Sequence, residues 1–340
     1  MYGHAVPQVG IIGASGFAGL ELLRLCAGHP ELEVAVATGD TQAGTAIAEL
    51  YPSLAGAYGR RAFDSYDAEA LDGLDVLFLA LPHGVSQGLV PELRGRAKHI
   101  IDLAADFRLT DPARYQQWYG EEHRCPDLLG DFAYGLPELY RSDISAATNI
   151  AAPGCYPTSA ILALAPLVRA GLISSNGVVV DAASGVSGAG RGKFPFCGTD
   201  EDFTAYGLLD HRHTVEIEEH VGAEVLFTPH LAPMNRGILA TCYARPTGET
   251  STAEVMDCLR AAYADEPFVV VTEASPSTKA TFGSNTAHIT ARHDPRTGWV
   301  LVLSALDNLV KGTSGQAIQC ANLLLGLDET TGLSTVGVYP

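Results

Sequence analysis

The sequence predicts an α/β protein of two domains, in which a doubly wound parallel sheet precedes an α+β domain with a mixed or antiparallel sheet. Three observations support this. The chain has 340 residues, enough for about two domains at roughly 150 residues each. Up to about residue 148, apolar runs alternate with helical patterns, and after it such runs lie close together. We expect residues 1–148 and 312–340 to form the first domain and 149–311 the second.

The first domain begins with a strand, a glycine-rich turn and a helix. Val9–Ile12 is a short apolar run, Leu20–Ala27 has helical apolar spacing, and Val34–Ala37 is a second strand. Val76–Leu81 and Ile100–Leu103 are further strands of the buried type. Strands that alternate with helices predict a parallel, doubly wound sheet.

The second domain contains strand candidates that follow one another more closely. Turn-like stretches join some of them, which indicates a mixed or antiparallel sheet and hence an α+β domain. Ala160–Ala170 and Thr313–Leu325 have the apolar spacing of helices. The strand candidates are Val178–Asp181, Glu224–Phe227, Ile238–Ala244, His288–Ala291 and Trp299–Leu303.

Composition excludes several classes of partner. Lys and Arg number 21 and Asp and Glu 39, so the formal net charge is −18, which repels nucleic acid and anionic lipid. No apolar run is long enough to span a membrane, and the N-terminal residues lack a signal segment, so we expect a cytoplasmic protein. The seven cysteines include no C-x-x-C pair, so we expect neither a disulfide framework nor a structural zinc.

Glycines recur every third residue from Gly10 to Gly19. A Rossmann-type turn needs glycine where the backbone bends and where it approaches a pyrophosphate at a helix N-terminus. The position directly after the first strand favours such a dinucleotide-binding turn, although a glycine-rich turn that binds nothing is the alternative. The candidate cofactor contacts are Gly13, Ser15, Gly16 and Phe17, with Thr38 at the end of the second strand.

Asp40 lies just after that second strand. An acidic residue here typically binds the ribose hydroxyls and disfavours a 2′-phosphate, which points to NAD. An ordinary turn aspartate is the alternative.

Cys155 follows a Pro-Gly turn and precedes an apolar helix. A helix N-terminus stabilises a thiolate and lowers the pKa of a thiol, and its N–H groups can hold an oxyanion. A buried structural cysteine is the alternative, and the residues alone leave both open.

A base for such a nucleophile is available in His211-Arg212-His213, which Glu216 follows. Each histidine could instead be a surface or hydrogen-bonded residue. His-x-His could also be half of a metal site, but no carboxylate or cysteine stands at a metal-type spacing, so we expect no metal.

Cations are scarce, and several lie beside glycine turns. Arg108 follows a strand end, the loop Ser184–Lys193 carries Arg191 and Lys193, and Arg236 precedes a glycine. Because Arg binds phosphate and carboxylate bidentately, the group suggests an anionic substrate. Surface ion pairs are the alternative for any one of them.

Together these segments resemble the N-acetyl-gamma-glutamyl-phosphate reductases of arginine biosynthesis, over essentially the whole chain. That family is related to the aspartate-semialdehyde dehydrogenases and, more distantly, to the glyceraldehyde-phosphate dehydrogenases. The proline-glycine-cysteine and His-Arg-His segments are specific, whereas the glycine turn is not. The segments are Asp106–Leu109, Pro153–Thr158, Ser184–Arg191, His211–Thr214 and Asn308–Gly312.

The resemblance implies an NADPH-dependent reduction of N-acetyl-glutamyl 5-phosphate to the 5-semialdehyde with release of phosphate. Cys155 matches the nucleophile that forms a thioester, and His213 matches the general acid/base, with His211 assisting. Val215 departs from the family pattern, which has proline there.

The resemblance also implies the remaining contacts. NADP is the family's cofactor, against the NAD that Asp40 favours. A homodimer or homotetramer that forms through the second domain is expected. Cofactor contacts are Ser184, Gly185 and, at the nicotinamide end, Asn308, and substrate contacts are Arg108, Ser187, Arg191 and Lys193.

Three alternatives stay open. A sister reductase acts on an acyl phosphate attached to an acidic carrier protein, for which an enzyme of charge −18 is a poor match. An aspartate-semialdehyde dehydrogenase is disfavoured by the residues around Cys155. A catalytically silent nucleotide-binding regulator has no need of both Cys155 and His213.

Overall fold

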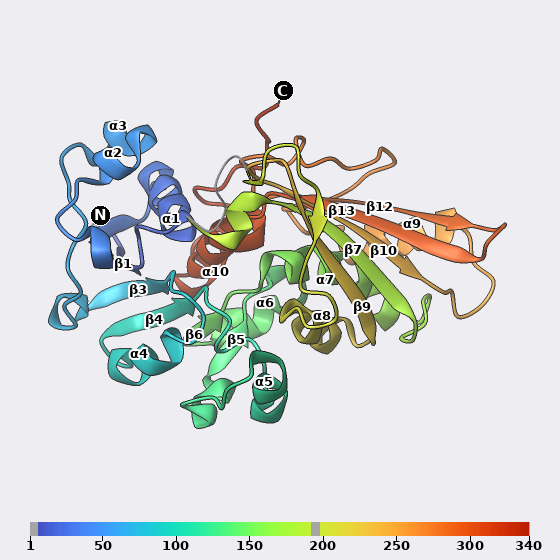
Figure 1. Cartoon of the computed structure of the whole chain (residues 1–340), viewed down its shortest axis with the longest axis horizontal. Helices are drawn as coiled ribbons and strands as arrows, with labels where there is room; N and C mark the ends of the chain where they lie inside the picture. The colour runs from blue at the N-terminus through green and yellow to red at the C-terminus, as the bar shows by residue number, and fades with distance from the viewer. Residues whose placement is uncertain (1–5, 192–197, 340) are drawn as a thin grey trace. The chain divides into compact units, whose positions relative to one another are not determined.

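A computed structural model describes residues 6–191 and 198–339 (Figure 1). The described chain forms two compact units. The first comprises residues 6–112, 122–153 and 313–333, and the second 113–121, 154–312 without 192–197, and 334–339. Within the described ranges no helix is both long and apolar enough to cross a membrane.

Two short pieces lie with the second unit, whereas the sequence placed them with the first. Residues 334–339 are held by backbone hydrogen bonds, in which Asn285 N–H donates to the Ser334 carbonyl (2.8 Å) and Val338 N–H to the Phe282 carbonyl (2.7 Å). In residues 113–121, Arg114 pairs with Glu218 at 3.2 Å. Such long-range pairings leave no periodic signal in the sequence.

The first unit is built on a six-stranded sheet in the order β2-β1-β3-β4-β6-β5, in which every pairing is parallel. This confirms the predicted doubly wound sheet. Its strands are β1 (Gln8–Ile12), β2 (Glu33–Thr38), β3 (Leu74–Leu79), β4 (Ala97–Asp102), β5 (Phe132–Tyr134) and β6 (Asn149–Ala151). Its helices are α1 (Phe17–Gly28), α2 (Ile47–Leu50), α3 (Ala55–Tyr58), α4 (Ser86–Leu93), α6 (Pro137–Ala146) and α10 (Gly315–Leu324).

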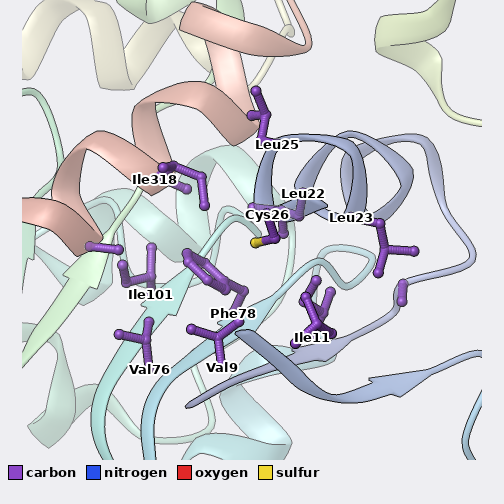
Figure 2. Packing of buried hydrophobic residues seen from close by; sticks show 14 of the residues in the cluster. Val9, Ile11, Leu22, Leu23, Leu25, Cys26, Val76, Phe78, Ile101 and Ile318 are labelled. Atoms are coloured by element: carbon purple, nitrogen blue, oxygen red, sulfur yellow. The ribbon is translucent and has the colours of Figure 1, made fainter. Parts of the chain in front are cut away.

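Strand β3 shows how this sheet buries both faces. Val76 and Phe78 belong to a core that α1 and α10 cover, and Figure 2 shows Phe78 beneath Cys26 of α1 and Ile318 of α10. The intervening Leu77 and Leu79 belong to a second core, which α4 covers. Because side chains alternate along a strand, a continuous apolar run serves both cores, which is typical of parallel sheets.

The second unit is built on a seven-stranded mixed sheet in the order β11-β12-β13-β10-β7-β9-β8. The β12-β13-β10-β7 pairings are antiparallel and β7-β9 is parallel, which confirms the predicted α+β architecture. The strands are β7 (Val178–Gly185), β8 (Thr204–Ala205), β9 (Val225–Ala232), β10 (Ile238–Ala244), β11 (Val269–Val271), β12 (Ala287–Asp294) and β13 (Trp299–Leu306). The helices are α5 (Pro112–Tyr119), α7 (Cys155–Arg169), α8 (His213–Val221) and α9 (Thr252–Ala262).

Helices α7, α8 and α9 pack against one face of this sheet (Figure 1). Along β7, β10 and β13, fully buried residues alternate with half-buried ones, so the opposite face is only partly covered. On that face Leu226, Val179, Tyr243 and Leu301 are register partners on four adjacent strands. We call these four residues the apolar row.

Candidate functional site

The glycine turn of the first unit joins β1 to α1. Gly13 has a φ of +86°, and a Cβ there would lie 2.4 Å from the Ala80 carbonyl oxygen. A Cβ on Gly19 would lie 2.5 Å from Ala14 Cα. These two glycines are therefore required by the backbone and packing of the unit itself.

Gly16, the N-cap of α1, has a different reason to be glycine. Its φ is −83°, and the nearest atom to a Cβ built there, Gly13 O, is 3.6 Å away. The protein therefore has room for a side chain that it does not carry. A bare backbone at a helix N-terminus fits the close approach of a dinucleotide pyrophosphate.

The other nucleotide-side candidates surround this turn. Thr38 is buried, and its Oγ1 accepts from Gly13 N–H at 3.2 Å. Ser15 Oγ donates to the Gly39 carbonyl at 3.0 Å. Phe17 is the half-buried first residue of α1, and Asp40 is exposed with a φ of +47°. Thr38 and Ser15 therefore brace the turn, while Asp40 faces solvent.

Arg108 lies near the carboxyl ends of β4 and β6 and is buried. Its Nε donates to the Ala152 carbonyl and its Nη2 to the Leu103 carbonyl, both at 2.8 Å. Two of its five N–H groups thus tie together the segments that follow these strands.

In the second unit, Cys155 is the first residue of α7, with Gly154 as the N-cap. It is half-buried. A Cβ on Gly312 would lie 2.8 Å from Cys155 Cβ, so glycine is needed where this segment passes the cysteine. The expected place of Cys155 at a helix start is confirmed.

Helix α8 begins at His213. His211 Nδ1 accepts a hydrogen bond from His213 N–H at 3.2 Å. The two imidazole rings are T-shaped, with centroids 4.8 Å apart. His211 therefore caps the helix that carries His213. Accepting through Nδ1 leaves the ring's proton on Nε2.

His211 is packed among aromatic rings. Those of Tyr156, Tyr206 and Phe227 lie at 5.9, 5.4 and 5.3 Å between centroids. Burial lowers the pKa of His211 to about 4 and raises the pKa of Tyr206 to about 12. His211 is thus neutral and Tyr206 protonated near pH 7.

Glu216 lies three residues after His213 on α8 and is fully buried. Its Oε1 accepts from Gly154 N–H at 2.8 Å, so α8 is joined to the turn before Cys155. Sequence reasoning assigned Glu216 no role of its own, because its partner is 62 residues away in the chain. Its place next to the His-Arg-His segment was the only signal.

Asn308 is buried, and its amide holds two segments together. Oδ1 accepts from Gly237 N–H at 2.7 Å, and Nδ2 donates to Ser187 Oγ at 3.0 Å. The predicted contacts Asn308 and Ser187 are therefore neighbours. Ser184 is also buried, and its Oγ donates to the Gly185 carbonyl at 3.0 Å.

The remaining cations differ in their surroundings. Arg236 pairs with buried Asp307 at 3.0 Å, so its charge already has a partner inside the unit. Arg191 is exposed. Lys193 lies outside the described residues. Sequence reasoning missed Asp307, whose carboxylate also accepts from the N–H groups of Leu309, Val310 and Gly283.

The six described cysteines are free thiols. In the described ranges, no three His, Cys, Asp or Glu side chains are grouped so that they could hold a metal ion.

Two family models match most of the chain. Residues 8–147 match a family model described as the NAD binding domain of semialdehyde dehydrogenase. Residues 155–308 match one described as the semialdehyde dehydrogenase dimerisation domain.

Curated relatives match nearly full length. An N-acetyl-gamma-glutamyl-phosphate reductase of Symbiobacterium thermophilum is 49% identical, over 98% of this chain and 99% of that protein. One from Pseudomonas putida is 47% identical over the same shares. Among solved structures, an aspartate semialdehyde dehydrogenase with NADP from Candida albicans has a TM-score of 0.70 at 14% identity, over 94% of this chain and 99% of that one. This last likeness shows the fold alone.

Proposed function

Because this chain belongs to the N-acetyl-gamma-glutamyl-phosphate reductases, a family of oxidoreductases, we propose that it reduces N-acetyl-glutamyl 5-phosphate to N-acetyl-glutamate 5-semialdehyde with NADPH, in arginine biosynthesis. One observation carries the proposal: Cys155 begins α7, and His213 begins a helix joined to that turn. A thiol at a helix N-terminus with a base nearby suits attack on an acyl phosphate.

Cys155 is the proposed nucleophile. Its sulfur attacks the acyl carbon, the carbon–sulfur bond forms, and the bond from that carbon to the phosphate oxygen breaks, so phosphate leaves. NADPH, when bound, supplies the hydride that reduces the thioester. The carbon–sulfur bond of the reduced adduct then breaks, which releases the aldehyde and regenerates Cys155.

His213 is the proposed acid/base. It takes the thiol proton during attack and returns it to sulfur when the aldehyde leaves. His211 assists as a neutral group, since its low pKa of about 4 keeps its imidazole uncharged near pH 7.

We propose Arg108, Ser187, Arg191 and Lys193 as the substrate contacts. The substrate is an anion, and Arg is suited to bidentate contacts with phosphate and carboxylate. The bonds from Arg108 to the Ala152 and Leu103 carbonyls hold its guanidinium in place for such a contact.

The proposed cofactor contacts are Gly13, Ser15, Gly16, Phe17, Thr38, Ser184, Gly185 and Asn308. The unfilled space at Gly16 supports a dinucleotide there. We propose NADP on the family resemblance, although Asp40 is the kind of residue that favours NAD.

We propose that the first unit, which contains most of residues 1–148 and 312–340, is the dinucleotide-binding domain. The second unit, which contains most of 149–311, would be the catalytic and oligomerisation domain. A homodimer or homotetramer would form through the face that carries the apolar row. The family model for residues 155–308 is described as a dimerisation domain, which supports this. We place the enzyme in the cytoplasm as a biosynthetic enzyme.

The deciding experiment is the reverse reaction. Purified protein is mixed with N-acetyl-glutamate semialdehyde and phosphate, and reduced nicotinamide is followed with NADP⁺ and with NAD⁺ separately. Phosphate-dependent reduction of NADP⁺ is the expected result. Reduction of NAD⁺ alone would overturn the assignment of NADP as the cofactor. No reduction of either would favour an acyl phosphate on a carrier protein as the substrate.

A further inference from the structure

We propose that Glu216 is a positioning residue, whose carboxylate fixes the Cys155 turn relative to the helix that begins with His213. This inference rests on the proposed function, since it gives Glu216 a part in the same cysteine chemistry.

The geometry includes a buried hydrogen bond between the starts of two helices. Glu216 Oε1 accepts from Gly154 N–H at 2.8 Å. Gly154 is the N-cap of α7, and the next residue is Cys155. On the other side, Glu216 follows His213 by three residues, which places them on the same side of α8. The bond therefore links the nucleophile's turn to the acid/base's helix.

A carboxylate is an unusual residue for this position. Glu216 has no exposed surface, and its chain neighbours Val215 and Ile217 are fully buried apolar residues. Burying a carboxyl group is unfavourable unless hydrogen bonds compensate for the lost water. Without Glu216, the Gly154 N–H group would lose Oε1 as its acceptor, at a cost of roughly 1–3 kcal/mol if no water replaced it.

The benefit lies in alignment. Attack by sulfur and proton transfer to His213 both depend on relative positions, and a displacement of about 1 Å can slow such a reaction about 100-fold. The hydrogen bond from the start of α8 to the start of α7 limits such displacements before the substrate binds.

The test compares three variants of the full chain with the wild type. Glu216→Ala removes the acceptor, and Glu216→Gln keeps an acceptor oxygen at the same reach. Glu219→Gln is the matched control, because Glu219 lies on the same helix but pairs with Arg114. The first measurement is the rate at which iodoacetamide alkylates Cys155 as a function of pH, read by mass spectrometry of the Cys155 peptide.

We expect Glu216→Gln and Glu219→Gln to follow the wild-type alkylation profile. In Glu216→Ala the pH midpoint of Cys155 alkylation should rise, and the alkylation rate near pH 7 should fall by about tenfold. The reason is that the thiol is no longer held at the N-terminus of α7. In the phosphate-dependent reverse reaction, Glu216→Ala should lower kcat by about 10–100-fold while both KM values stay within about threefold.

Wild-type alkylation and kcat in Glu216→Ala, with only a lower Tm, would reduce Glu216 to a structural residue and overturn the proposal. Equal losses of Cys155 alkylation rate and kcat in Glu216→Gln would overturn it too, because this variant keeps the acceptor oxygen of the hydrogen bond. If Glu216→Ala does not fold, Glu216→Asp replaces it: one methylene shorter, it should show the same losses, and wild-type behaviour would again refute the idea. Alkylation needs no substrate, so an inactive wild type would refute the proposed function alone.

Discussion

Cys155 is distinguished from the other described cysteines by its place at the start of a helix. Burial raises the pKa of Cys26 and Cys242 to about 12. Cys125 and Cys258 are half-buried, burial raises their pKa as well, and their thiols donate to main-chain carbonyls. Cys155 alone among the described thiols begins a helix as long as α7 after a glycine N-cap.

Cys155→Ser should lower turnover in the reverse reaction by at least about 1,000-fold, because the serine hydroxyl is a far weaker nucleophile than a thiolate at neutral pH. NADP⁺ binding, measured by calorimetry, should stay unchanged. Cys258→Ser serves as the control and should keep wild-type turnover. Full activity in Cys155→Ser would rule out this nucleophile.

His213→Asn should slow turnover by about 10²–10⁴-fold, the range for loss of an acid/base. His211→Asn should be milder, since His211 is uncharged near pH 7. Steady-state kcat of the two variants provides the comparison. The reverse order of damage would mean that the two roles are exchanged.

His211 also predicts a pH dependence of stability. Its pKa is lowered from 6.5 to about 4 in the folded protein, so between these values the unfolded chain binds more protons. Stability is therefore lost as pH falls through this window. The effect is at most about 3 kcal/mol, less the part screened by solvent.

The measurement is the free energy of unfolding of the wild type and His211→Gln at about pH 7.5 and about pH 5. The wild type should lose more stability between them than the variant does. His29 and His288, whose pKa values burial also lowers, are present in both proteins and cancel. If the free energies of unfolding of the wild type and His211→Gln differ by the same amount at both pH values, the low pKa of His211 is contradicted.

At this scale, the sequence could indicate residues with a local context. Cys155 follows a Pro-Gly turn, and His213 lies in a cluster of histidines, so both could be chosen. Glu216 and Asp307 could not, because their function depends on donors from distant segments. The buried hydrogen bonds of Arg108 were equally invisible, since only the fold brings Ala152 to its guanidinium.

At the scale of elements, the glycines of the turn before α1 fall into two kinds: Gly13 is required for folding and Gly16 is not. Gly13→Ala forces a side chain into positive φ against the Ala80 carbonyl, and should destabilise the protein by more than about 1 kcal/mol. Gly16→Ala meets no such contact. It should keep the wild-type Tm but weaken NADP⁺ binding about tenfold or more, or about 1.4 kcal/mol.

Thermal unfolding and NADP⁺ calorimetry on the two variants check this contrast. Unchanged cofactor affinity in Gly16→Ala would mean that the dinucleotide does not approach this turn.

Elements with a strong apolar period were predictable from the sequence, and short or polar ones were not. The helix predicted from Ala160 begins five residues earlier, at Cys155, because the Pro-Gly turn supplies its start. Strands β8 and β11 have two and three residues, too few for alternation to be seen. Helix α8 was missed because its first turn contains polar residues.

For the whole molecule, the partly covered sheet face of the second unit predicts a contact between copies of the chain. Leu301→Asp places a charge at the β13 end of the apolar row, and should shift the proposed oligomer toward monomer because an unpaired charge would be buried. Light scattering coupled to gel filtration measures the mass. Val336→Asp is the control, since Val336 is an exposed apolar residue outside this row. A mass unchanged by Leu301→Asp would exclude this face as the contact.

Helix α10 gives the first unit a particular order of assembly during synthesis. Ile318 of α10 closes the core around Val9 and Phe78, yet it is made more than 300 residues after β1. While the ribosome translates the second unit, the nascent first unit therefore holds an open apolar face that chaperones can bind. Chains stalled before residue 313 should be cut readily by protease in this unit, and chains released in full should resist.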